Sequence, residues 1–122
     1  MILADTSIWI DHLRAGDEEL GEELRRGNVA IHPLIIAELA LRSLRERART
    51  LALLDALPQV RVARLSEVRR MIESRRLYGL GIGLMDAHLI ASVMISSPTL
   101  LWTRDKPLRR VAAGLGVHTR MT

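Results

Sequence analysis

Short apolar runs, each followed by helical segments, constrain the fold of this chain more than any other feature of its sequence. The runs lie at residues 2–4, 29–32, 60–65, 99–102 and 116–119. One or two helical patterns separate each run from the next, which is typical of parallel strands joined by crossover helices. The sequence therefore predicts an α/β fold in which helices cover both faces of a central, mainly parallel sheet.

The predicted helices begin at capping residues or proline and end near glycine or proline. Asp5, Thr6 and Ser7 favour a helix start before an apolar repeat that begins at Ile8. Glycines at 79, 81 and 83 precede the most apolar helix. The remaining expected helices cover about 17–26, 33–44, 45–57, 66–78, 84–96 and 106–113.

Composition limits the class of protein further. The 122 residues include no cysteine, so we exclude a disulfide framework, a thiolate zinc site and a cysteine nucleophile. The length fits a single domain, residues 1–122, with its own core. The first residues lack the positive region of a signal peptide, and no apolar stretch reaches the ~20 residues of a membrane-spanning helix. We therefore expect a cytoplasmic protein.

The charge balance favours an anionic partner. There are 18 basic and 14 acidic residues, a net charge of +4, and every basic residue except Lys106 is an arginine. Arginine suits phosphate recognition, but a GC-rich genome produces the same bias in proteins of any function. Arg42, Arg45 and Arg49 share one helical face, yet Glu38 and Glu46 lie close enough in sequence to make this an ordinary solvated surface. Charge alone does not decide the function.

Four acidic residues occupy positions from which their side chains can converge. Asp5 and Asp105 follow predicted strands, whereas Glu38 and Asp86 lie in the first halves of unusually apolar helices. All four can therefore meet at the carboxyl edge of the sheet, where open α/β folds place their sites. Such a cluster persists at neutral pH only if protons or a cation neutralise it, and oxygen ligands favour Mg²⁺ or Mn²⁺.

Each acid also has an ordinary structural explanation. Asp5 and Asp105 are good helix N-caps. Arg42 lies four residues after Glu38 and can form an ion pair with it, as is common on helices. Asp86 has no basic neighbour at helical spacing, but an acid in the first turn of a helix interacts favourably with the helix dipole.

No other motif in the sequence competes with these acids. The glycines at 79–83 lack the spacing of a nucleotide-binding loop, and there is no nucleophile elbow. Both tryptophans fall in apolar runs, which predicts that they pack in the core. His88 lies two positions from Asp86, which places the two residues on different sides of a helix. The other three histidines, His12, His32 and His118, have no ligand spacing between them, and we interpret each as structural or exposed.

The acidic residues lie in four ordered motifs that resemble those of the PIN-domain nucleases, and among them the VapC-type toxins of bacterial toxin–antitoxin pairs. The motifs are ADTSIW at residues 4–9, IAEL with Glu38, MDAHLIA with Asp86, and WTRD with Thr103 and Asp105. The resemblance covers essentially the whole chain and implies a three-layer α/β/α sandwich. The segment KPLRR departs from it, because Leu108 stands where many relatives have an aromatic residue.

The resemblance also implies a chemistry. Asp5, Asp86 and Asp105 would ligate Mg²⁺ or Mn²⁺, and Glu38 would support the ion directly or through water. The hydroxyl groups of Thr6 and Thr103 would lie beside these acids. The implied activity is endonucleolytic hydrolysis of RNA, such as a transfer or ribosomal RNA, by a dimeric toxin whose acidic groove is covered by a VapB-like antitoxin.

Two alternatives remain at this stage. A PIN fold without catalysis would act as an RNA-binding module. A phosphoacceptor receiver domain has a similar length and also carries acids at strand ends. However, Glu38 and Asp86 lie in predicted helices, and Lys106 is the only lysine. Both features argue against a receiver.

Overall fold

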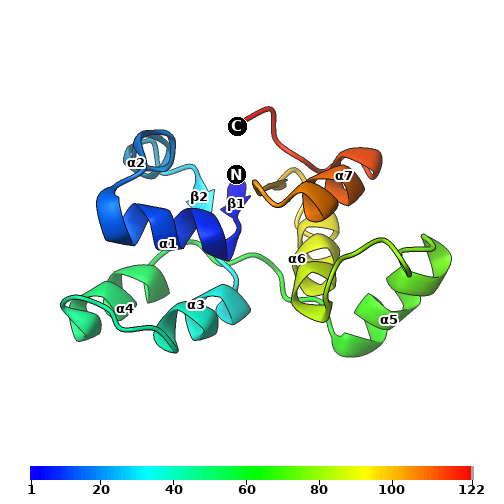
Figure 1. The fold of residues 1–122 in the computed structure, drawn as a ribbon, viewed down its shortest axis with the longest axis horizontal. Helices are drawn as coiled ribbons and strands as arrows, with labels where there is room; N and C mark the ends of the chain where they lie inside the picture. Colours follow the sequence, from blue (N-terminus) through cyan, green and yellow to red (C-terminus); the bar gives the residue numbers. More distant parts are fainter. Residues whose placement is uncertain (122) are drawn as a thin grey trace.

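The computed structural model describes residues 1–121 and is built around a small parallel sheet (Figure 1). Its strands are β1 (Ile2–Ala4), β2 (Val29–Ala30) and β3 (Leu100–Trp102). The strand order is β2-β1-β3, and both pairings with the central β1 are parallel. The carboxyl ends of the three strands therefore point to the same edge of the sheet, as the sequence predicts.

Seven helices surround this sheet in the described part of the chain. Figure 1 shows the first four grouped on one side of the strands and the last three on the other, which confirms the predicted α/β sandwich. The helices are α1 (Thr6–Ala15), α2 (Glu18–Arg25), α3 (Pro33–Ala40), α4 (Arg47–Asp55), α5 (Leu65–Ser74), α6 (Leu84–Met94) and α7 (Lys106–Gly114). None of those in residues 1–121 has both the length and the apolar content that crossing a bilayer requires.

The core lies between the sheet and both groups of helices. The strands contribute Leu3 and Leu101, which are completely buried. Trp9 of α1 and Trp102 of β3 are 3% and 0% exposed, which confirms that both tryptophans pack inside. Most of the buried apolar side chains belong to one continuous cluster, so the short strands are fixed by packing as well as by hydrogen bonds.

Two predicted strands are wrong. Residues 60–65 and 116–119 form no strand, although each segment lies near a single bridge, Ile31 to Gln59 and Leu101 to His118. A single bridge places each segment beside the sheet but does not provide the series of hydrogen bonds that makes a strand. Apolar residues of these segments instead help to cover the core; Val60, for example, is 6% exposed.

The helix after Pro33 is shorter than expected and ends at Ala40 rather than near residue 44. The guanidinium group of Arg47 donates hydrogen bonds to the backbone carbonyls of Arg42 and Ala40. These bonds satisfy carbonyl groups that would otherwise lack a partner at the helix end. The chain can therefore turn at 41–46 into α4.

Candidate functional site

Asp5 and Asp105 begin the helices that follow β1 and β3. The Oδ1 atom of Asp5 accepts a hydrogen bond of 2.6 Å from the backbone N–H of Thr6, and Asp5 caps α1. The Oδ2 atom of Asp105 accepts one of 3.1 Å from the N–H of Leu108 at the start of α7. The capping role expected of both residues is thus confirmed. Because β1 and β3 are neighbouring parallel strands, the two caps lie at the same edge of the sheet.

Thr103 connects these two acids. Its side chain is completely buried, and its hydroxyl group donates a hydrogen bond of 2.7 Å to Oδ2 of Asp5. The hydroxyl oxygen of Thr103 in turn accepts a bond of 3.1 Å from the backbone N–H of Asp105. The imidazole of His118 supports this position, since its Nε2 atom lies 3.2 Å from the carbonyl oxygen of Thr103. The Asp5 carboxylate is therefore held in one orientation.

The electrostatics of Asp5 reveal its acidic neighbours. Burial raises the pKa of the Asp5 carboxyl above its ordinary value, and the hydrogen bonds from Thr103 and Thr6 oppose this shift. The negative charges of Asp86 and Asp105 raise the pKa of Asp5 further. These three carboxylates, contributed by segments far apart in the sequence, are therefore within electrostatic range of one another.

Asp86 lies in the first turn of α6, as its structural explanation predicts. Its Oδ2 atom accepts a hydrogen bond of 3.1 Å from the backbone N–H of Gly83, which completes a capping arrangement. Its Oδ1 atom makes no hydrogen bond to the described residues, and the same holds for Oδ1 of Asp105. Each of these two acids thus keeps one oxygen available for a ligand.

Glu38 differs from the expectation. Its helical neighbours are apolar, which is typical of a buried position, but the residue is exposed. It also forms no ion pair with Arg42 among residues 1–121, so the structure does not show the ion pair that was its ordinary structural explanation. Glu38 lines a hollow of about 270 Å³ between α3 and α6 with six other residues: Leu34, Ala37, Leu41, Leu84, Met85 and His88.

His88 is the residue of this region that the sequence analysis set aside. It is half-buried on α6, and its Nδ1 atom is buried without a hydrogen-bond partner among residues 1–121. Helical spacing correctly separates it from Asp86, yet it shares the hollow with Glu38. Only the packing of α3 beside α6 brings these two residues together, and nothing local in the sequence signals it.

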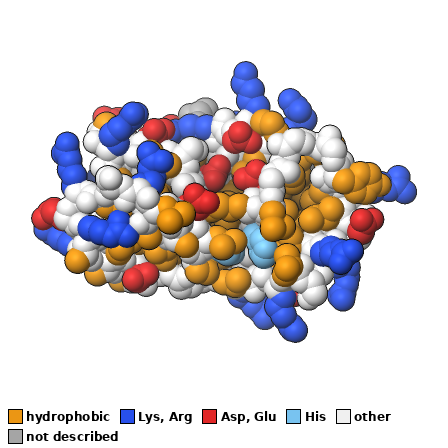
Figure 2. All heavy atoms as spheres, turned by 60° about the horizontal axis from the view of Figure 1, so that its bottom comes forward, with side chains coloured by type: hydrophobic (Ala, Val, Ile, Leu, Met, Phe, Trp, Pro, Cys, Tyr) orange, Lys and Arg blue, Asp and Glu red, His pale blue; other side chains and the backbone are white. Residues whose placement is uncertain are grey.

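Asp5, Asp86 and Asp105 form what we call the acidic edge, and their donor atoms suit a hard divalent cation. No three histidine, aspartate or glutamate side chains in residues 1–121 already stand close enough together to hold an ion. However, the available donors are all oxygens, which Mg²⁺ and Mn²⁺ prefer. The hydroxyl oxygen of Thr6, next to Asp5, is buried and has no hydrogen-bond partner in the described chain. Figure 2 shows acidic side chains gathered around a hollow in the middle of one face, with basic side chains mainly toward its ends.

Comparison with known proteins is consistent with this geometry. The model of the family described as "PIN domain" matches residues 2–114. Two curated proteins named Ribonuclease VapC32, from Mycobacterium tuberculosis strains CDC 1551 / Oshkosh and ATCC 25618 / H37Rv, are each 48% identical to this chain over 117 residues. The aligned regions cover 96% of this chain and 94% of each relative.

Proposed function

Because this chain belongs to the PIN-domain family, we propose that it is a VapC-type endoribonuclease toxin that hydrolyses RNA with the help of Mg²⁺ or Mn²⁺. The observation that carries this proposal is the placement of Asp5 and Asp105 at the ends of neighbouring parallel strands, where Thr103 links them and the charge of Asp86 acts on Asp5. The name of the two relatives supports RNA cleavage, and the oxygen donors of the edge support a divalent cation.

The residues of the acidic edge have distinct roles in this proposal. Asp5 and Asp86 would hold the cation, and Asp105 and Glu38 would complete its surroundings directly or through water. When bound, the cation lowers the pKa of a water molecule and offsets the charge that develops on the leaving oxygen. Thr103 fixes the orientation of the Asp5 carboxylate by donating to Oδ2. The hydrogen bond from Gly83 does the same for Asp86.

The partners follow from the same proposal. The substrate is an RNA such as a transfer or ribosomal RNA, and a VapB-like antitoxin inhibits the toxin by covering the acidic edge. The protein would encounter the RNA and the antitoxin in the cytoplasm. The absence of cysteine from the chain agrees with this location. A PIN module without catalysis would bind the same RNA but would have no use for the three acids that interact at this edge, Asp5, Asp86 and Asp105.

Removal of divalent cations tests the proposed reaction. We expect the purified protein to cleave a labelled RNA in the presence of Mn²⁺ or Mg²⁺, to stop when EDTA is added, and to resume when excess Mn²⁺ is restored. Gel electrophoresis of end-labelled RNA measures each step. Cleavage that persists in EDTA would contradict the assignment. RNA binding without cleavage under every condition would favour the non-catalytic module.

We also propose that the apolar surface around the α3–α6 hollow binds a second copy of the chain. Leu34, Leu41 and Leu84 are 36%, 85% and 59% exposed on or beside these helices. The hollow also contains one carboxylate, Glu38, and one imidazole, His88. A twofold axis through this surface would cover the exposed leucines of both copies.

Substitution of two exposed leucines tests this contact. We expect the Leu41→Glu/Leu84→Glu variant to be monomeric by light scattering at a concentration at which the wild-type protein is dimeric. The control is Leu53→Glu/Leu65→Glu, which changes leucines that are 61% and 60% exposed on α4 and α5. A monomeric wild-type protein, or equal dissociation of the control, would exclude this surface as the dimer contact.

A further inference from the structure

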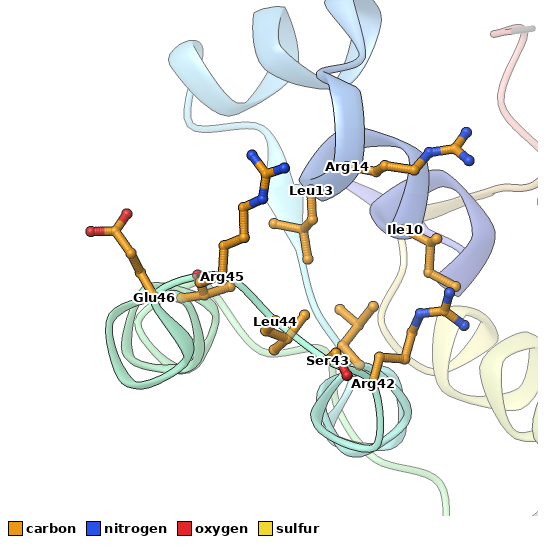
Figure 3. Close-up of a pocket in the computed structure, with 10 residues that line it drawn as sticks. Ile10, Leu13, Arg14, Arg42, Ser43, Leu44, Arg45 and Glu46 are labelled. Carbon is orange, nitrogen blue, oxygen red and sulfur yellow. Dashed lines mark hydrogen bonds between the residues drawn. The ribbon is translucent and has the colours of Figure 1, made fainter.

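A second hollow, lined mainly by residues of α1 and the segment between α3 and α4, carries an excess of positive charge. Its volume is about 450 Å³. Figure 3 shows the side chains of Arg14, Arg42 and Arg45 around it, with Leu13 and Leu44 pointing into it. We call it the arginine pocket, and its lining residues are Ile10, Leu13, Arg14, Leu39, Arg42, Ser43, Leu44, Arg45, Glu46 and Thr50.

Carboxylates of the described chain do not neutralise the positive charge of this pocket. Neither Arg42 nor Arg45 forms an ion pair with a carboxylate in residues 1–121. Arg14 lies 3.6 Å from Asp11 in an exposed pair of the kind that contributes little. The carboxylate of Glu46 points away from the hollow in Figure 3 and lies 3.8 Å from Arg49. The guanidinium groups at the rim are thus available to an anion.

The segment that carries two of these arginines is held by specific hydrogen bonds. The guanidinium group of Arg47 donates a bond of 3.0 Å to the carbonyl oxygen of Arg42. The hydroxyl group of Thr50 donates one of 3.0 Å to the carbonyl oxygen of Arg45. The backbone positions of both arginines are therefore fixed, which reduces the entropy that binding must remove.

The arginine pocket and the acidic edge are connected by shared elements. Asp5 caps the start of α1, and Arg14 lies near its end, about 13 Å farther along the helix axis. Glu38 lies on α3, and Arg42 follows it by four residues. A chain of phosphates that extends from the acidic edge along α1 would therefore reach the arginine pocket.

We propose that the arginine pocket binds the backbone phosphates of the RNA substrate a few nucleotides away from the bond that is cleaved. This inference rests on the proposed function. The planar guanidinium group forms paired hydrogen bonds with phosphate oxygens. The apolar side chains of Leu13 and Leu44 provide a surface for a ribose or an unstacked base between the charged groups. The pocket contributes affinity and does not take part in the chemical step.

Salt-dependent RNA binding tests this inference. We compare the wild-type protein with Arg42→Gln/Arg45→Gln by fluorescence anisotropy of one fluorescein-labelled single-stranded RNA, in EDTA so that the RNA stays intact. The logarithm of the association constant falls linearly with the logarithm of the salt concentration, and each phosphate contact contributes about 0.7 to the magnitude of that slope. The slope of the double variant should therefore be smaller in magnitude by about 1.4. In Mn²⁺, its KM should rise while kcat remains unchanged.

The matched control removes two arginines at the opposite end of the molecule. Arg69 and Arg70 are exposed on α5, so Arg69→Gln/Arg70→Gln causes the same change in net charge without touching the pocket. This control should retain the wild-type slope. Equal losses in both double variants would show that only net charge matters, and an unchanged slope for Arg42→Gln/Arg45→Gln would show that RNA bypasses the pocket. Either result overturns the inference.

A third outcome identifies a different occupant. If Arg42→Gln/Arg45→Gln binds RNA normally but loses affinity for an acidic protein such as the antitoxin, the pocket is a protein-docking site and the RNA inference fails. Failure of the proposed function has a separate signature, because the wild-type protein would then cleave no RNA in Mn²⁺. The binding slope in EDTA does not depend on cleavage, so the two failures can be told apart.

Discussion

Replacement of Asp86 by asparagine is expected to reduce RNA cleavage by at least about a hundredfold without unfolding the protein. Residues that only support a metal ligand already change metal affinity or activity by roughly 10–100-fold, and loss of a direct ligand should exceed this range. Asparagine keeps an oxygen that can accept the hydrogen bond from the backbone N–H of Gly83, so the start of α6 should remain capped. Single-turnover cleavage in Mn²⁺ measures the loss, and circular dichroism verifies the fold.

The matched control for Asp86→Asn lies on α5. Glu67 plays the same capping role there, because its Oε1 atom accepts a hydrogen bond of 2.9 Å from the backbone N–H of Arg64. Glu67→Gln should therefore change stability as little as Asp86→Asn does, while retaining wild-type cleavage. Full activity in folded Asp86→Asn would remove Asp86 from the site. A comparable loss in Glu67→Gln would show that capping, rather than the acidic edge, controls activity.

The sequence predicted the sheet and the starts of most helices because the relevant signals are local. Continuous apolar runs indicate buried strands. Aspartate before an apolar helical repeat indicates an N-cap, and Asp5 and Asp105 are N-caps in the structure. The segment at 60–65 was misread because apolar alternation does not show whether a backbone partner is available. Only the fold determines that this segment lies beside one end of the sheet.

The exposure of Glu38 could not be predicted for a related reason. Its neighbours Leu34 and Leu41 are apolar, but they are themselves 36% and 85% exposed. Apolar residues on a helix surface indicate that the surface is buried against a partner. They do not indicate whether that partner is part of the same chain. The second copy that we propose would cover these exposed leucines, although no helix within residues 1–121 does. The placement of Asp5 and Asp105 at one edge could be predicted because parallel strands end there, whereas the exposure of Glu38 could not.

The buried network around His32 was also not foreseen, although a lone polar residue in the apolar run before Pro33 is a weak signal for it. His32 is completely buried at the start of α3. Its Nδ1 atom accepts a hydrogen bond of 3.0 Å from the N–H of Leu34, so the proton is on Nε2, which lies 3.0 Å from the hydroxyl oxygen of Ser92. Ser92 also accepts a bond of 3.1 Å from the N–H of Ala63. This network ties α3, which carries Glu38, to α6, which carries Asp86.

Acidification is expected to destabilise the protein through His32. Burial, together with the charge of His88, lowers the pKa of His32 from 6.5 to about 4. The unfolded chain therefore takes up the proton at a higher pH than the folded protein does. The contribution of neutral His32 is complete above about pH 6.5 and is lost as the pH falls toward 4. We expect the free energy of unfolding to decrease by about 2 kcal/mol between about pH 7 and 4.5 for this reason.

Urea unfolding of His32→Asn at both pH values isolates this contribution, because the variant and the wild-type protein share all their carboxyl groups. The variant should be less stable at neutral pH, since asparagine can still cap α3 but is too short to reach Ser92. It should also lose about 2 kcal/mol less than the wild-type protein on acidification. If His32→Asn and the wild-type protein lost equal stability, the buried imidazole would not be the group that titrates. Apolar contacts alone would then have to account for the packing of α3 against α6.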